Sequence, residues 1–324
     1  MDNWSAFFDG QTRYFLDIND SSVKPDVLRF YGREALSEPF SWDIEFTTLQ
    51  ANIPPEEVLM KYASFRMRSG KSVHGMVTRL EWLSTSKDQS HYRLTLSSRL
   101  ALLGYTRQCA VYQNQSVPEV VEPVLRKHGL EGPDFEFRLE RTYPPREIIT
   151  QWRETDLEFI RRILSEVGIY WRTEMDDVRG LDTYIFADSQ LNYQFDVRLP
   201  YSEPSGLFGG AAESVWGLPY TERYCFRLAE ILRPEIHGTL PARGESREKN
   251  DIYAHRDEQG RYRVKLDFDR EGTEPGYGYL WLRMAKPYAG ETLGWHTPLI
   301  DGTEVAIAYS NGDIDLPYRM LTAS

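Results

Sequence analysis

One segment, from Thr150 to Trp171, constrains the fold of this chain more than any other, because it encodes a helix that runs directly into a strand. Thr155 and Glu158 have the spacing of a capping box, in which the hydroxyl accepts a hydrogen bond from the first turn and the carboxylate accepts one from the cap amide. Gly168 is a typical C-terminal stop. Apolar residues between these ends recur at three- and four-residue steps, which predicts one buried stripe. They are Leu157, Ile160, Leu164 and Val167.

The opposite face of this predicted helix is polar, and we expect it to face solvent. It carries Arg161, Arg162, Ser165 and Glu166. The residues at 169–171 are β-branched or aromatic and favour a strand, which we predict to pair with 183–187 across a polar turn. The simplest interpretation of the whole segment is an amphipathic helix that packs on a sheet.

The chain before this segment is predicted to be mostly antiparallel β-structure. Runs of aromatic and branched residues between polar turns predict strands at 13–18, 27–35, 40–47, 67–83 and 89–97. In the last of these, Tyr92, Leu94 and Leu96 alternate with polar residues, so one face should be buried and the other solvated. A short helix is predicted at 54–61, with Pro54 and Pro55 tolerated in its first turn.

A second capping box, formed by Ser116 and Glu119, predicts another helix that ends at Gly129. Pro123 conflicts with this helix, because an internal proline removes one hydrogen bond and costs about 3 kcal/mol. We therefore expect a kinked helix at Pro123, or a position under relaxed selection.

The last third of the chain has an all-β pattern. Strand candidates lie at 251–255, 261–269, 279–284 and 303–309. Asn311-Gly312 is a strong hairpin signal that closes onto Ile314 and Leu316. Five short antiparallel strands of this kind suit a small barrel of the oligonucleotide/oligosaccharide-binding (OB) type.

As strings, several segments resemble the VgrG family, the spike proteins of type VI secretion systems, which are similar to the hub and spike of contractile phage tails. The signature is QWRETDLEFIRRILSEVGIYW at 151–171, and further segments are EPFSWDIEFTT, VHGMVTRLEWL, YRLTLSSRLALLG and the block 233–318. The resemblance implies a β-rich α+β fold, in which a hub-like β-barrel portion with two helices precedes a small antiparallel OB-type barrel.

The resemblance also implies a domain organisation. We expect a partial hub domain at 1–199, a loop and deletion junction at 200–232, an OB-type barrel at 233–318 and an unmatched tail at 319–324. The stretch 200–217, PYSEPSGLFGGAAESVWG, is rich in glycine, serine and proline. Family members carry a long middle block here and a needle after the barrel, and we interpret both as absent. An intact but divergent short hub is the alternative.

The function implied is that of a structural component of the puncturing spike, in truncated form. Intact relatives form a self-trimer that mates with the secretion-tube hexamer and carries a needle with its tip protein. Without the middle block and the needle, we expect weak association or a monomer. The alternative is a stand-alone binding or adaptor module that recognises a glycan or a spike partner through the C-terminal barrel.

Aromatic residues cluster in the barrel region and form the candidate interaction surface. They are Trp281, Trp295, Tyr277 and Tyr288, with Tyr279 nearby. Such rings could stack on a sugar or on single-stranded nucleic acid. The alternative, which we favour, is that they fill the small barrel and its trimer contacts.

Enzymatic interpretations are weak. Two carboxylate pairs, Asp267 with Asp269 and Asp313 with Asp315, could serve acid-base chemistry on glycans, but paired acids beside turns more often protect strand edges. The histidines lack the spacing of a zinc site, and no nucleophile elbow or phosphate-binding loop is present. We therefore expect no catalytic residue, no metal and no cofactor.

Charge and composition exclude several classes of partner. The net charge of −11 argues against nucleic acid and anionic membranes, and no apolar run is long enough for a membrane anchor. Cys109 and Cys225 are too few for a disulfide framework, so we expect buried free thiols in a reducing compartment. The N-terminal residues MDNWSAFFDG are acidic where a signal peptide is basic. We expect a cytoplasmic protein, whereas intact relatives are exported by the type VI machinery.

Overall fold

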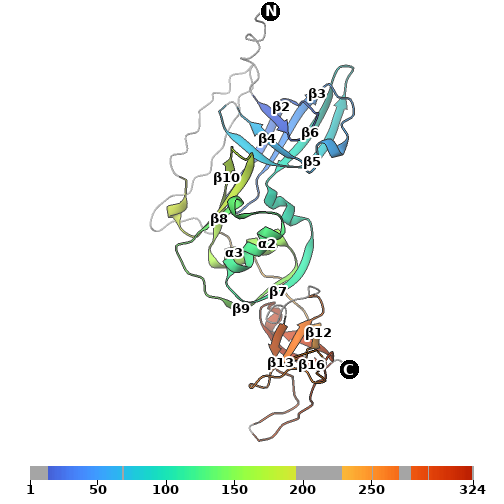
Figure 1. The fold of residues 1–324 in the computed structure, drawn as a ribbon, viewed down its shortest axis with the longest axis vertical. Helices are drawn as coiled ribbons and strands as arrows, with labels where there is room; N and C mark the ends of the chain where they lie inside the picture. Colours follow the sequence, from blue (N-terminus) through green and yellow to red (C-terminus); the bar gives the residue numbers. More distant parts are fainter. Residues whose placement is uncertain are drawn as a thin grey trace, which may run out of the picture. The chain divides into compact units, whose positions relative to one another are not determined.

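A computed structural model describes residues 14–67, 69–194, 228–249, 251–269, 279–290 and 292–322 (Figure 1). Of these residues, those numbered up to 103, 125–142 and 167–229 form one compact unit, and those numbered 104–124, 143–166 and 230 onward form a second. Each unit therefore combines segments that are far apart in the sequence.

The first unit contains a six-stranded antiparallel sheet with the strand order β1-β4-β5-β6-β3-β2. Its strands are β1 (Phe15–Ile18), β2 (Asp26–Arg33), β3 (Ser41–Thr48), β4 (Tyr62–Arg66), β5 (Ser72–Thr85) and β6 (Ser90–Ser97). The predicted alternation in β6 is confirmed, because Tyr92, Leu94 and Leu96 are buried. The helix predicted at 54–61 is wrong: only a single 3-10 turn, Pro55–Glu57, forms, and the backbone leaves helical geometry at Val58.

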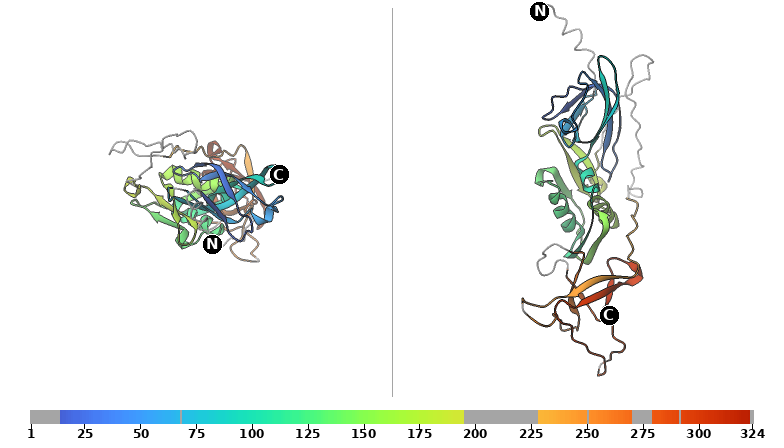
Figure 2. Two further views of the ribbon diagram at one scale, coloured as in Figure 1. Left: turned by 90° about the horizontal axis from the view of Figure 1, so that it is seen from above. Right: turned by 90° about the vertical axis from the view of Figure 1, so that its right-hand side faces the viewer.

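This sheet curls, as the two views in Figure 2 show, but its ends do not join by strand pairing. The outermost strands are β1 and β2. The ring of Tyr14, next to β1, lies 4.9 Å from the ring of Phe30 in β2, centroid to centroid. The edges thus approach through side chains, and the described strands form a half-barrel instead of a closed barrel.

A three-stranded sheet completes the first unit. Its strands are β8 (Phe135–Arg138), β10 (Tyr170–Asp176) and β11 (Leu181–Ala187), in the order β10-β11-β8. The predicted hairpin is confirmed, with Trp171 opposite Phe186. Buried Arg99 fixes this sheet to the turn before β8: its Nε lies 2.7 Å from Asp182 Oδ1 and its Nη2 lies 3.2 Å from Asp134 Oδ1.

The second unit contains the ribbon of β7 (Arg107–Gln115) and β9 (Arg146–Thr155), and the helix α3 (Asp156–Val167) belongs to it almost entirely. The capping box of α3 is confirmed: Thr155 N donates to Glu158 Oε2 at 2.9 Å, and Glu158 N donates to Thr155 Oγ1 at 3.1 Å. Gly168 has a φ of +73°, as its role as a stop requires. The second predicted helix also forms as α2 (Val117–Lys127), with Pro123 inside it and Gly129 after it.

The barrel of the second unit has five strands in the order β14-β13-β12-β15-β16. They are β12 (Thr239–Gly244), β13 (Tyr262–Leu266), β14 (Tyr279–Leu282), β15 (Glu304–Tyr309) and β16 (Pro317–Thr322). A parallel bridge between Met284 and Met320 closes the sheet. The predicted β-rich fold, with two helices and an OB-type barrel, is confirmed.

Two details of the barrel differ from the prediction. The segment 251–255 makes only isolated bridges, and Thr239–Gly244 supplies the first strand, although Pro241 weakens its local strand signal. Residues 319–322 are not a tail outside the fold: they lie in β16, where Met320 is fully buried. The turn at Asn311-Gly312 is confirmed, with φ values of +53° and +74°.

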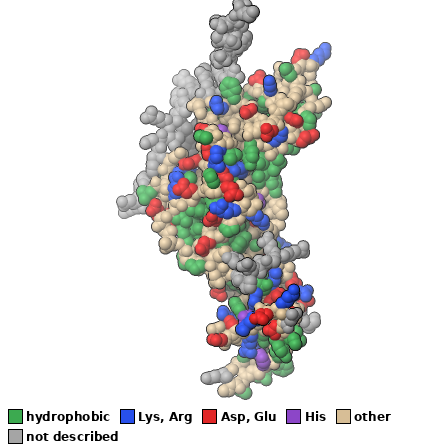
Figure 3. Space-filling model, in the orientation of Figure 1, with side chains coloured by type: hydrophobic (Ala, Val, Ile, Leu, Met, Phe, Trp, Pro, Cys, Tyr) green, Lys and Arg blue, Asp and Glu red, His purple; other side chains and the backbone are tan. Residues whose placement is uncertain are grey.

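Both signs of charge are interspersed over the face drawn in Figure 3. Neither α2 nor α3, the α-helices of the described residues, combines the length and hydropathy needed to cross a membrane.

Candidate functional site

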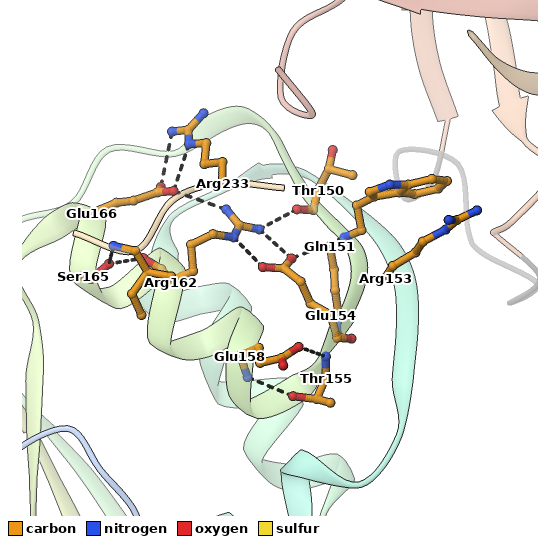
Figure 4. A network of polar contacts seen from close by, with 12 residues as sticks. Thr150, Gln151, Arg153, Glu154, Thr155, Glu158, Arg162, Ser165, Glu166 and Arg233 are labelled. Atoms are coloured by element: carbon orange, nitrogen blue, oxygen red, sulfur yellow. Dashed lines mark hydrogen bonds and ion pairs between the residues drawn. The ribbon is translucent and has the colours of Figure 1, made fainter. Parts of the chain in front are cut away.

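A buried charge network in the second unit is centred on Arg162 (Figure 4). The Arg162 side chain is fully buried, and its Nε and Nη2 donate to the two carboxylate oxygens of Glu154 at 2.7 and 2.9 Å. Nη2 also donates to the carbonyl oxygen of Thr150 at 2.8 Å, and Nη1 donates to Glu166 Oε1 at 3.2 Å. The expectation that Arg162 and Glu166 face solvent is therefore wrong.

The partners explain why a guanidinium can be buried at this point. Burial by itself lowers the pKa of Arg162, but the hydrogen bonds and charge of Glu154, together with the charge of Glu166, raise it above its usual value. A buried charge is tolerated when its donors are satisfied by opposite charges in good geometry. Arg162 thus connects α3 to β9 through its bonds to Thr150 and Glu154.

Arg233 extends the network to the barrel. Its Nε donates to Glu166 Oε1 at 2.9 Å, and its Nη1 lies 3.3 Å from Asp313 Oδ1 and 3.2 Å from Asp315 Oδ2. Asp315 Oδ1 also accepts a hydrogen bond from Thr150 N at 2.7 Å. One continuous set of charge-assisted contacts therefore joins Glu166 in α3, Thr150 in β9 and the turn before β16.

The candidate carboxylate pairs are engaged in such contacts. Asp313 and Asp315 both face Arg233. Burial raises the pKa of Asp315, whereas the hydrogen bond from Thr150 and the charge of Arg233 act in the opposite direction. Asp267 lies 3.5 Å from Arg243, and Asp269 is nearly buried. These environments favour the structural interpretation of both pairs.

The candidate aromatic residues lie on two different parts of the barrel domain. Trp295 and Tyr288 are 55% and 59% exposed and share one hairpin, in which Trp295 N donates to the Tyr288 carbonyl oxygen at 3.2 Å. Trp281 is half-buried in β14, where its ring and that of His255 form a T-shaped pair with their centroids 4.9 Å apart. Tyr277 lies outside the described residues.

Metal-ligating residues and thiols provide no candidate site among the described residues. Among the residues that the structure describes, no group of three or more His, Cys, Asp or Glu is placed to hold a metal ion. Cys109 is a partly buried free thiol whose sulfur accepts a hydrogen bond from Arg153 N at 3.2 Å. Cys225 lies outside the described residues.

No local sequence pattern predicts the Arg162–Arg233 network. The only local signal is Glu166, four residues after Arg162, which reads as an ordinary exposed helix pair. The contact between Thr150 and Asp315 spans 165 positions, so no local pattern reports it.

Comparison with known families assigns both parts of the chain. Residues 33–228 match the phage tail baseplate hub (GPD) family, and residues 251–322 match the type VI secretion system/phage-baseplate injector OB domain.

Curated relatives and solved structures agree with these matches. The type VI secretion system spike protein VgrG5 of Pseudomonas aeruginosa is 34% identical over 200 residues, which cover 61% of this chain and 25% of that protein. The actin cross-linking toxin VgrG1 of Vibrio cholerae is 25% identical over 298 residues, which cover 82% of this chain and 27% of the toxin. The chain thus spans about a quarter of the length of these relatives.

A solved structure extends the likeness to nearly the whole chain. The Escherichia coli c3393 protein is a component of the type VI secretion system with structural similarity to the phage T4 tail proteins gp27 and gp5. It is 36% identical with a TM-score of 0.78, and the match covers 94% of this chain and 98% of that one. With a hub match over more than half of its length, followed by an injector OB domain, this chain belongs to the VgrG family of type VI secretion spike proteins.

Proposed function

We propose that this chain serves as a hub-and-barrel component of a type VI puncturing spike, and that its function is mechanical, not catalytic. The observation that carries the proposal is the buried network in which Arg162 and Arg233 share Glu166. A network with this many charge-assisted bonds fixes orientation, because each bond depends on a defined geometry and each charge is held by more than one bond. Such a fixed connection is what a component that transmits force requires.

In this proposal the chain joins full-length spike chains in a threefold assembly that it does not form stably by itself. The hub portion mates with the secretion-tube hexamer and the barrel passes the threefold axis to a needle and its tip protein. The chain is made in the cytoplasm and leaves the cell with the type VI machinery. Support comes from the hub match at 33–228 followed by the injector OB match at 251–322, and from the likeness to the c3393 type VI component over 94% of this chain.

Co-expression tests the assignment. The tagged chain would be produced together with a full-length VgrG spike and its tube protein, and then purified by affinity. Recovery of either component supports the proposal. Recovery of neither, from protein that circular dichroism finds folded, contradicts it.

We further propose that the hub is internally shortened, with a partial hub at 1–199, a junction at 200–232 and an OB-type barrel from 233. The support is the open six-stranded sheet, whose outer strands β1 and β2 are not paired with each other. Unpaired edges weaken a ring that depends on strand pairing. Sedimentation should therefore find weak association or a monomer, and a stable trimer at micromolar concentration would reject the shortening while leaving the spike assignment intact.

A stand-alone binding or adaptor module is the second candidate. Trp295 and Tyr288 favour it, because both are more than half exposed on one hairpin. Pull-downs with glycans and spike components would compare the wild type with Trp281→Ala and Trp295→Ala. Selective loss of binding without loss of folding would support this function.

A further inference from the structure

The outer face of β13 and β14 gathers cationic and aromatic side chains. In both strands the residues that point inward are buried and the alternate ones are half-buried. The register places Arg263 opposite Trp281 and Lys265 opposite Tyr279. These side chains therefore share the face that is turned away from the barrel core.

Cations of two neighbouring strands lie directly opposite each other on this face, an arrangement that strand pairing does not favour. Arg243 in β12 lies directly opposite Lys265, and like charges in that position repel, although Asp267, 3.5 Å from Arg243, offsets part of this repulsion. The guanidinium of Arg263 stands 4.0 Å from the centre of the Tyr279 ring, and the Lys265 ammonium stands 5.7 Å from it. Among the described residues, no carboxylate lies within ion-pair distance of Arg263.

The loop between β12 and β13 contributes a further cation, Arg247. His255, whose ring meets Trp281, accepts hydrogen bonds at Nε2 from Arg247 Nε and Nη2 at 3.3 and 3.1 Å. Burial, and then the charges of Arg247 and Arg263, lower the pKa of His255, whereas Asp257 and Asp251 raise it. His255 Nε2 thus serves as the acceptor that holds the Arg247 guanidinium.

We propose that the β13–β14 face, defined as Arg243, Arg263, Lys265, Tyr279 and Trp281, binds a short anionic oligosaccharide whose sugars carry carboxylate or phosphate groups. The second and third strands of an OB barrel, with the loop between the first and second, are where this fold binds oligomers. The ring of Trp281 offers an apolar surface to a sugar, and Arg263 and Lys265 supply donors to its anionic groups. The inference names the ligand of the binding module considered above and does not depend on spike assembly.

Charge selects this ligand over longer polyanions. The chain carries −11 overall, so a long nucleic acid would meet repulsion beyond the face. The charges of a short oligosaccharide lie close to the cations it contacts, within one Debye length, which is about 8 Å at physiological salt. Sugar rings also need only one exposed aromatic surface, whereas single-stranded nucleic acid binds through successive stacked bases.

Titration calorimetry with purified oligogalacturonate tests the proposal, with a maltooligosaccharide of equal length as the neutral comparison. We expect binding of the acidic sugar only, with affinity that falls as salt rises. Arg263→Ala should weaken binding about tenfold or more, since one charge-assisted hydrogen bond contributes that much. Trp281→Ala should also weaken it, and Lys265→Gln should reduce the salt dependence.

Arg319→Ala is the matched control, because Arg319 packs 5.5 Å from the ring of Tyr318 in β16 of the same barrel. It should leave binding unchanged, and thermal unfolding confirms that each variant is folded. Equal binding of the neutral sugar, or an unaffected Arg263→Ala protein, would overturn the proposal. So would tighter binding of oligo-dT or of a polyglutamate peptide, which are measured in parallel.

Discussion

Ser37 and Trp171 exchange two hydrogen bonds across 134 positions of the sequence: Ser37 N donates to the Trp171 carbonyl oxygen at 2.9 Å, and Trp171 N donates to Ser37 Oγ at 3.2 Å. Both residues are buried, and Ser37 holds a left-handed backbone with a φ of +59°. This pair joins the turn between β2 and β3 to the start of β10. The pair therefore connects the six-stranded sheet of the first unit to the β10–β11 hairpin, which follows α3.

Substitutions at Ser37 should separate the contribution of the hydrogen bond to stability from the contribution of backbone strain. Ser37→Ala leaves the buried Trp171 amide without its acceptor, and we expect the free energy of unfolding to fall by about 1–3 kcal/mol. Ser37→Gly loses the same bond but relieves a left-handed conformation that costs about 1 kcal/mol. Urea unfolding should find the glycine variant the more stable of the two, and the reverse order would contradict this account.

Removal of the Arg162 side chain should be the most damaging change in the second unit. Arg162→Met leaves Glu154 buried without its cation and removes one of the cations that pair with Glu166, and we expect a loss of about 3–5 kcal/mol. The adjacent Arg161→Ala is the control and should change stability by less than about 0.5 kcal/mol. The double variant with Glu154→Gln should lose less than the sum of its single variants, because the two residues interact.

Glu45 should make the stability of the first unit depend on pH in strong acid. The hydrogen bond from Arg29, and then those from Arg93, hold the pKa of Glu45 at about 2, below its ordinary 4.5, although burial acts in the opposite direction. A depressed pKa adds stability that is fully present above the unfolded value of 4.5 and is lost as the pH falls through about 2. Urea unfolding of the wild type and Glu45→Gln should differ most at neutral pH and converge in this window. If the difference in unfolding free energy between the two proteins stayed constant down to about pH 2, the lowered pKa of Glu45 would be contradicted.

Gly32 should not accept a side chain. A Cβ at this position would lie 2.1 Å from the nearest carbon of the Trp42 ring, which is itself buried. We expect Gly32→Ala to lower the free energy of unfolding by about 1–3 kcal/mol through overpacking. Gly132→Ala, where nothing lies within 4 Å of the added Cβ, is the control. In a Trp42→Ala background, the cost of Gly32→Ala should largely disappear.

The sequence by itself determined the features that depend on neighbours a few residues apart. The capping pair Thr155 and Glu158, the stop at Gly168 and the alternation around Leu94 are local patterns, and each forms as the sequence predicts. The order of hub and barrel also follows from the sequence, because each domain carries its own segment signals.

Only the tertiary structure decided which polar residues are buried and which weak strands are used. Arg162 has the local pattern of a solvated residue, but Thr150, Glu154 and Glu166 enclose it. β12 and β16 form because the barrel supplies partners on both sides of Ala242 and a buried place for Met320. The physical reason is that desolvation and strand pairing are set by residues that are distant in the chain, such as Asp315, 165 positions from Thr150.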